Sequence, residues 1–171
     1  MEICQLIDLR KANYKLQGRL NFQGLNVSIE NRKGSVRSGV DKDGHEWRTK
    51  MAHAYGRIIG IKRQGQDGEK LDCFIGPDKA SQKVFIIHIN HADTGEFDED
   101  KCYLGFESKD AVMSSFQKHY DKAGQKLFGG ISEMSMDAFK KKLEEDSDEM
   151  IKGSQREGSR RNEGFCSRYF E

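Results

Sequence analysis

The segment of residues 26–89 consists of short runs of β-branched and aromatic residues that are broken by Gly, Asn and Asp. Runs of this kind, separated by turn residues, predict short β-strands joined by tight turns. Strands at this spacing suit a small closed, OB-like β-barrel better than a sheet whose strands alternate with helices. The expected strands are residues 27–30, 35–40, 47–50, 55–61, 72–75, 84–89 and 101–106.

Two helices are expected near the end of this pattern. Ser108 is a good N-cap, and apolar residues recur at helical spacing from Ala111 to Tyr120, while a second helix opens at Ser135. The glycine pair at 129–130 predicts a break between them. The expected fold class is therefore α+β, with both helices packed on the barrel.

The composition divides the chain into three expected parts. Residues 1–20 form an N-terminal helical arm, residues 21–145 the barrel domain with its helices, and residues 146–171 a charged tail that is disordered when unbound.

The chain has 35% hydrophobic and 33% charged residues and lacks an apolar run near the roughly 20 residues of a membrane-spanning helix, so we expect a cytoplasmic protein. A net charge of +1 gives no general attraction to nucleic acid, and such contact is expected only through the basic tail.

Two acidic groups precede predicted strands. Asp67, Glu69 and Asp72 lie within six residues of one another, and a second group at residues 93–100 ends just before Lys101. Carboxylates packed this closely repel each other unless a cation lies among them, and oxygen ligands favour Mg²⁺ or Mn²⁺ over zinc. The alternative is a pair of solvated turns. If both groups rise at the same end of the barrel, they predict a metal site that is open to a ligand.

A basic run comes before both acidic groups. In the expected strand of residues 35–40, alternation places Arg37 on the same face as Ser35 and Gly39, so Arg37 is expected to point into a cleft. A cationic side chain opposite a carboxylate and metal site is what phosphate chemistry requires. The alternative is an exposed basic edge strand.

Other reactive residues have simpler interpretations. The four cysteines lack the spacing of a metal site and are interpreted as reduced thiols. His88 lies in an apolar strand and is interpreted as a structural histidine, and Trp47 as a core residue.

Several segments, taken in order, resemble the soluble, Mg²⁺-dependent inorganic pyrophosphatases, a family of single-domain barrels. They are IE-x-x-KGS from Ile29, YG-x-I from Tyr55, DG-x-x-x-D from Asp67 and an acidic loop that ends in Lys101. Over residues 21–143 the chain looks more specifically like the pyrophosphatase-like domain of large polyvalent proteins of bacteriophages and conjugative elements. This resemblance implies a protein that acts in the cytoplasm of a bacterial host cell.

The resemblance implies a set of metal ligands for Mg²⁺, with Mn²⁺ as an alternative ion. These are Asp67, Asp72, Asp98, Glu99 and Glu30. In the second acidic group the inner ligand falls on Glu99 or, with a shift of one residue, on Asp98, and the outer ligand on Asp93 or on none.

The resemblance also implies the groups that act on the substrate. The catalytic residues are Glu69, Tyr55, Lys101 and Arg37, and the further substrate-binding residues are Lys33 and Arg48. Glu69 falls where the family has the Asp that helps to deprotonate the attacking water, and Lys70 replaces a family Pro.

The implied activity is Mg²⁺-dependent hydrolysis of a phosphoric anhydride, in the first place inorganic pyrophosphate, by a metal-activated water. Two alternatives stay open. One is the same chemistry on a larger nucleotide-type diphosphate, and the other is a non-catalytic accessory module of a phage or plasmid that counters host defence by binding a host protein or nucleic acid through residues 156–161. The oligomeric state is also open, a homo-oligomer included.

Overall fold

The computed structural model of the chain describes residues 16–61 and 71–145. The predicted tail, most of the predicted N-terminal arm, and the site residues Asp67 and Glu69 lie outside the described residues.

Within the described residues the elements follow one another along the chain in an order that is mostly strand. They are β1 (Gly18–Phe22), β2 (Leu25–Asn31), β3 (Val36–Val40), β4 (Glu46–Lys50), β5 (Ala54–Ile59), β6 (Asp72–Ile75), β7 (Lys83–Asn90), β8 (Phe97–Leu104), α2 (Lys109–His119), the 3₁₀ turn η1 (Gly124–Leu127), β9 (Phe128–Ser135) and α3 (Met136–Glu144). This confirms the α+β class. No helix among the described residues is long and apolar enough to cross a membrane.

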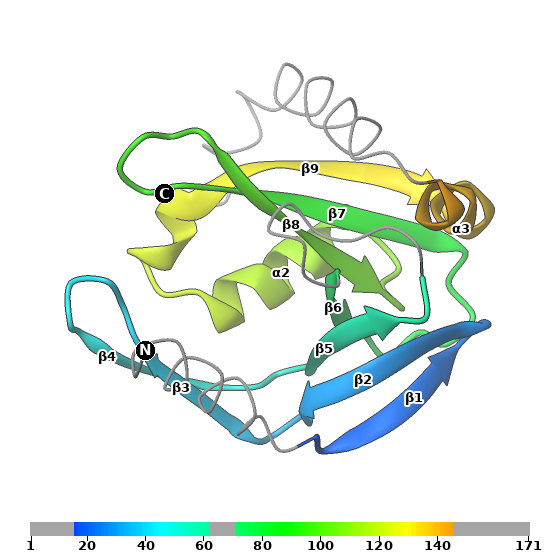
Figure 1. Cartoon of the computed structure of the whole chain (residues 1–171), viewed down its shortest axis with the longest axis horizontal. Coiled ribbons are helices and arrows are strands. Elements are labelled where there is room, and N and C mark those ends of the chain that lie inside the picture. Colours follow the sequence, from blue (N-terminus) through cyan, green and yellow to red (C-terminus); the bar gives the residue numbers. More distant parts are fainter. Residues whose placement is uncertain (1–15, 62–70, 146–171) are drawn as a thin grey trace, which may run out of the picture.

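Seven strands form one curved sheet in the order β1-β2-β5-β6-β8-β7-β9, while β3 and β4 pair only with each other (Figure 1). The closed barrel is not confirmed. Its predicted strands at residues 35–40 and 47–50 form a separate hairpin, so the described part of the large sheet keeps β1 and β9 as two unjoined edges. Every neighbouring pair in this sheet is antiparallel except β6 and β8.

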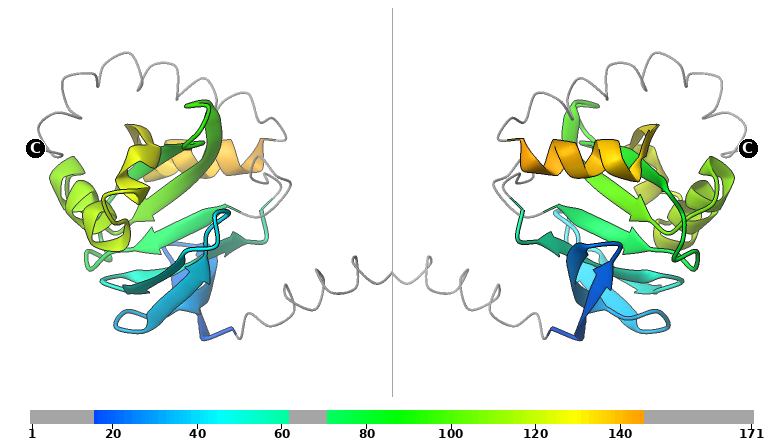
Figure 2. Two further views of the ribbon diagram at one scale, coloured as in Figure 1. Left: turned by 90° about the vertical axis from the view of Figure 1, so that its left-hand side faces the viewer. Right: turned by 90° about the vertical axis from the view of Figure 1, so that its right-hand side faces the viewer.

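The two helices pack against different faces of the sheet. In β7, alternate side chains enter two hydrophobic clusters: Ile86 lies in the cluster that includes Phe139 of α3, and Ile87 in the cluster that includes Phe116 of α2. Helix α2 lies within the curve of the sheet, above the β3–β4 hairpin (Figure 1). Seen from the side, the β1–β2 hairpin and α3 lie at opposite ends of the molecule (Figure 2).

Both predicted helix starts are confirmed. The hydroxyl of Ser108 accepts a hydrogen bond from the backbone N–H of Ala111 at 3.2 Å, and that of Ser135 accepts from Ala138 at 3.1 Å. Each cap satisfies a backbone donor that the helix leaves unpaired, which is typically worth about 1 kcal/mol.

Three predicted boundaries are wrong. Strand β1 begins at Gly18, within the segment predicted as a helical arm. Strand β9 runs through the glycine pair at 129–130, where a break was predicted. Gly129 serves close packing there, because the Cβ of a larger residue would lie 2.5 Å from Oδ1 of Asn90. Strand β8 begins at Phe97, so the acidic residues 98–100 lie in a strand and not in a loop.

Candidate functional site

The parallel pairing of β6 with β8 brings Asp72 beside Lys101. The Lys101 Nζ lies 2.7 Å from Oδ2 of Asp72 and 2.8 Å from Oε1 of Glu99, and its side chain is 7% exposed. Two carboxylates from neighbouring strands therefore converge on one buried cation. Asp72 of the first acidic segment and Glu99 of the second therefore lie together.

Tyr55 completes this group from β5. Its hydroxyl donates a short hydrogen bond to Oδ2 of Asp72, and Lys101 Nζ lies 3.3 Å from the same hydroxyl. Burial is the main cause that raises the pKa of Tyr55, so the phenol keeps its proton at neutral pH and acts as a donor.

Arg37 reaches the group from the separate β3–β4 hairpin. Its guanidinium carbon lies 4.4 Å from the centre of the Tyr55 ring and 5.4 Å from that of Trp47. Alternation in the hairpin turns Arg37 and Trp47 inward and leaves their strand neighbours exposed, as the sequence predicts for Arg37. Trp47 is only partly buried and lies outside both hydrophobic clusters, so its interpretation as a core residue is wrong.

Glu30 joins the site through Arg57, a residue that sequence reasoning missed. Arg57 Nε lies 2.9 Å from Oε1 of Glu30 and 3.4 Å from Oδ1 of Asp72. Arg57 could have been found from its spacing, because it lies two residues after Tyr55 and a strand places such residues on the same face.

Tyr120, which follows the last residue of α2, is a second missed residue. Tyr120 packs against the hydrophobic cluster that includes Tyr55 and Phe74. Burial is the main cause that raises the pKa of its phenol, and the charge of Lys101 partly offsets this effect. Its spacing fits the apolar face of α2, and this pattern predicts only a packing role.

The carboxylates of the site differ in their affinity for protons. Burial raises the pKa of Glu30 and of Glu99, and the nearby Arg57 and Lys101 offset only part of this effect. Burial acts in the same direction on Asp72, but the charge and hydrogen bond of Lys101 and the hydrogen bond from Tyr55 outweigh it, so the pKa of Asp72 is lowered. Burial alone would lower the pKa of Lys101, yet the charges of the Asp72 and Glu99 carboxylates help to raise it. Asp72 and Lys101 are therefore a charged pair.

The donor set fits a hard divalent cation. Oxygens of Asp72 and Glu99 already lie within 2.8 Å of one ammonium nitrogen, so they can approach a single cation together. Carboxylate oxygens are the ligands that Mg²⁺ and Mn²⁺ prefer. Asp67 lies outside the described residues, as does Glu69, the predicted base.

The remaining predicted site residues lie apart from this group. Lys33 is exposed in the turn after β2, and Arg48 is on the outward face of β4, opposite Ser38. Asp98 precedes Glu99 on β8, so its side chain points to the other side of the strand, where it is half-buried and its Oδ1 lies 3.5 Å from His91 Nε2. Asp93, the alternative ligand, is paired with Lys42 at 3.0 Å.

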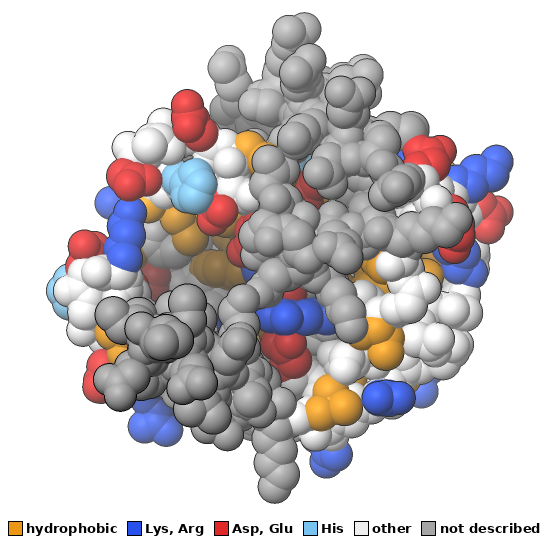
Figure 3. All heavy atoms as spheres, viewed as in Figure 1, with side chains coloured by type: hydrophobic (Ala, Val, Ile, Leu, Met, Phe, Trp, Pro, Cys, Tyr) orange, Lys and Arg blue, Asp and Glu red, His pale blue; other side chains and the backbone are white. Residues whose placement is uncertain are grey.

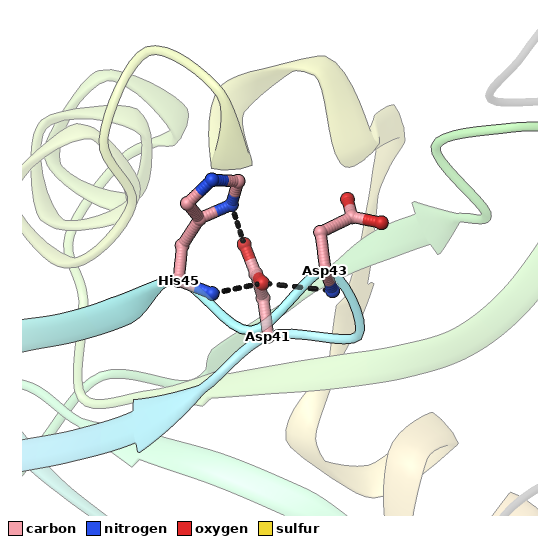
Figure 4. Close-up of side chains that lie close together, drawn as sticks. All are labelled: Asp41, Asp43 and His45. Atoms are coloured by element: carbon pink, nitrogen blue, oxygen red, sulfur yellow. Dashed lines mark hydrogen bonds and ion pairs between the residues drawn. The ribbon is translucent and has the colours of Figure 1, made fainter.

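Another cluster of possible metal ligands lies in the β3–β4 turn (Figure 4). Asp41, Asp43 and His45 place one ligand atom each within 4.8 Å of one another, but all three are exposed. The Asp41 Oδ1 accepts hydrogen bonds from the backbone N–H groups of Asp43 at 2.9 Å and His45 at 2.8 Å. These hydrogen bonds stabilise the turn and account for the closeness of the three side chains without a metal ion.

A buried row of hydrogen-bonded polar side chains lies on the face of the sheet opposite to Lys101. His88 Nδ1 is 2.5 Å from Oδ1 of Asp100, and its Nε2 is 2.7 Å from the hydroxyl of Ser132. Both ring nitrogens have partners, which agrees with the interpretation of His88 as structural. Cys73 and Cys102 are buried free thiols on adjacent strands, in agreement with the reduced state predicted for them.

The face of the molecule seen in Figure 3 has a hollow. Viewed as in Figure 1, acidic, basic and hydrophobic side chains lie next to one another within this hollow (Figure 3). Side chains of both charges beside an apolar wall suit a polyanion that arrives with its metal ions.

One comparison with known proteins gives a result. A family model described as inorganic pyrophosphatase matches residues 8–144. No curated protein and no solved structure matches the chain.

Proposed function

Since the chain belongs to the inorganic pyrophosphatase family, we propose that it hydrolyses inorganic pyrophosphate to phosphate with a metal-activated water. The observation that carries the proposal is the convergence of Asp72, Glu99, Tyr55 and Lys101 at one point of the sheet. The site is a metal-dependent hydrolase site of the type that the resemblance implies, in the version found in phages and conjugative elements, and it works in the cytoplasm of a bacterial host cell.

Asp72 and Glu99 are the proposed inner ligands for Mg²⁺, and Glu30 is the proposed outer one. Asp67 belongs to the same proposal as a further ligand, whereas Asp98, which lies apart from this group beside His91, does not. When bound, the ion would neutralise phosphate charge and lower the pKa of a coordinated water. Glu69, one methylene longer than Asp, is the proposed base for that water.

Three donors of the chain would bind the anion. Within the described residues, Arg37 contacts two aromatic rings and has no carboxylate at ion-pair distance, so its guanidinium is available to a phosphate. The hydroxyl of Tyr55 donates its single proton to Asp72, and it can turn that proton toward a phosphate oxygen when a metal ion occupies the Asp72 carboxylate. Lys101 has a flexible stem, and its ammonium can turn from Glu99 toward a phosphate oxygen when a metal ion occupies the carboxylates. Together these groups would stabilise the charge that develops on the leaving phosphate.

A larger diphosphate is the second candidate substrate, and one observation favours it. The Trp47 ring lies beside Arg37 on the inward face of the hairpin and is partly exposed. An aromatic face next to a phosphate site can stack on a nucleobase.

The test is the release of phosphate from a panel of substrates, with Mg²⁺ and with EDTA. Pyrophosphate, a nucleoside diphosphate and a phosphate monoester form the panel. We expect Mg²⁺-dependent release from pyrophosphate and none from the monoester. Release from the nucleoside diphosphate alone would select the second candidate, and no release from either anhydride would contradict the proposed function.

A further inference from the structure

His119, the last residue of α2, contacts elements that carry the candidate site. Its ring stacks on Phe74 of β6, with the ring centroids 4.7 Å apart. Its Nε2 accepts a hydrogen bond from the backbone N–H of Ala52 at 3.0 Å, just before β5. Asp72 lies two residues before Phe74 on β6, and Tyr120 directly follows His119. The imidazole therefore links the end of α2 to β6 and to the segment just before β5.

The hydrogen bonds of His119 fix its proton on one nitrogen. Nε2 accepts from the backbone of Ala52 at 3.0 Å and faces the backbone N–H of His53 at 3.4 Å, so it carries no proton. Nδ1 then carries the proton, and it lies 3.3 Å from the hydroxyl of Ser115 in the preceding turn. A hydrocarbon side chain would leave the Ala52 donor without this acceptor.

Two further hydrogen bonds join the same parts of the chain. His53 Nδ1 lies 2.9 Å from the hydroxyl of Ser115, and the hydroxyl of Thr49 donates to the carbonyl oxygen of His119 at 3.4 Å. The end of α2 is thereby held against Thr49 of β4 and against residues 51–53, the connection between β4 and β5.

These contacts define where two phenols of the site lie. Tyr55 follows His53 by two residues, and its hydroxyl contacts both Asp72 and Lys101. Tyr120 follows His119 and packs against the hydrophobic cluster that includes Tyr55 and Phe74. A shift of the α2 end relative to the β4–β5 connection would change the distance between the two rings.

We propose that His119 is a positioning residue of the site, whose Nε2 acceptor holds Tyr120 in place relative to Tyr55 and Asp72. The kinetic consequence of this placement rests on the proposed function, whereas the hydrogen bond from Ala52 does not. A role in stability alone would predict that any equal destabilisation of α2 has the same effect on turnover.

Two variants of His119 separate the acceptor from the ring. His119→Phe keeps an aromatic ring against Phe74 and removes the acceptor, whereas His119→Gln offers an amide oxygen that can accept the Ala52 N–H. Val112→Ala is the matched control, because Val112 is fully buried in α2 and makes none of these hydrogen bonds. All proteins are assayed well below their unfolding temperatures.

Steady-state hydrolysis of pyrophosphate with Mg²⁺ gives the first measurement. Misplacement on the ångström scale costs on the order of a hundredfold in rate, so we expect His119→Phe to lower kcat by about ten- to a hundredfold with a much smaller change in KM. His119→Gln should stay within about threefold of wild type, and Val112→Ala should keep its kcat. In a Tyr120→Phe background, His119→Phe should add little further loss, because the two residues act through one placement.

Hydrogen exchange of the Ala52 amide gives the second measurement, which needs no activity. We expect the wild-type amide to be protected, His119→Phe to exchange about tenfold faster, and His119→Gln to restore protection.

The outcomes distinguish the proposal from the proposed function. If wild type hydrolyses pyrophosphate, an unchanged kcat in His119→Phe, or an equal loss in Val112→Ala, overturns the positioning role. If wild type hydrolyses no phosphoric anhydride, the proposed function fails while the exchange measurement still decides: faster exchange in His119→Phe supports the positioning contact, and unchanged exchange overturns it.

Discussion

Acidification from pH 7 to pH 5 is expected to destabilise the fold through His119. Burial and the neighbouring His53 lower the pKa of His119 from 6.5 to about 4. Between these two values the unfolded chain binds a proton at His119 that the folded protein does not bind. The free energy of unfolding is therefore unaffected above about pH 6.5 and falls as the pH drops toward 4.

The magnitude follows from the distance between the pH and the unfolded pKa. A pH of 5 lies 1.5 units below 6.5, the pKa of His119 in the unfolded chain. At 1.36 kcal/mol per unit, protonation of the unfolded chain lowers the free energy of unfolding by about 2 kcal/mol. Because solvent reaches part of the ring, we expect about 1–2 kcal/mol.

Urea unfolding of wild type and His119→Gln at both pH values measures this effect. The variant lacks the titrating ring, while His53 and the carboxylates titrate in both proteins and cancel in the comparison. The loss of stability between pH 7 and pH 5 should be smaller in the variant by about 1–2 kcal/mol. An equal loss in both proteins would refute the assignment of a buried, neutral acceptor at His119.

Three further predictions concern the sheet and the site. Gly56→Ala should cost more than about 3 kcal/mol and lower the melting temperature strongly, because the new Cβ would lie 2.1 Å from the carbonyl oxygen of Ser28; a melting temperature equal to that of wild type would argue against the β2–β5 packing. Arg37→Ala should lower kcat/KM for pyrophosphate by about a hundredfold, whereas Arg48→Ala should change it by less than about twofold, and equal effects would remove Arg37 from the anion site. Lys101→Met should bind Mg²⁺ more tightly by calorimetry while losing turnover, because the ammonium occupies the carboxylates; an unchanged or weaker affinity would contradict this competition.

The central strands could be predicted because their side chains carry a clear pattern. Residues 72–75 were predicted and found as β6, and β7 extends the predicted 84–89 by one residue at each end. Strands β1 and β9 could not be predicted in this way. β1 begins with Gly18 and Arg19 and contains no β-branched residue. β9 contains two adjacent glycines, of which Gly129 allows Asn90 to approach the backbone.

The sequence predicts the types of residue at the site better than it predicts which individual residues come together there. Asp72 and Lys101 lie 29 residues apart, and only the parallel pairing of β6 and β8 makes them neighbours, a pairing that no local pattern shows. Arg57 and Tyr120 were missed because each fits a strand or helix pattern that already explains it. Lys33 and Arg48 were assigned from the resemblance, and the alternation of the β3–β4 hairpin turns Arg48 away from the group.

Phosphate release from pyrophosphate in the presence of Mg²⁺, compared between wild type, Asp72→Asn and Asp43→Asn, tests the central claim most directly. Asp43 is an exposed carboxylate of the β3–β4 turn, so Asp43→Asn makes the same chemical change away from the site. We predict Mg²⁺-dependent release by wild type and by Asp43→Asn, and its loss in Asp72→Asn with an unchanged circular dichroism spectrum. Full activity in Asp72→Asn would contradict the account.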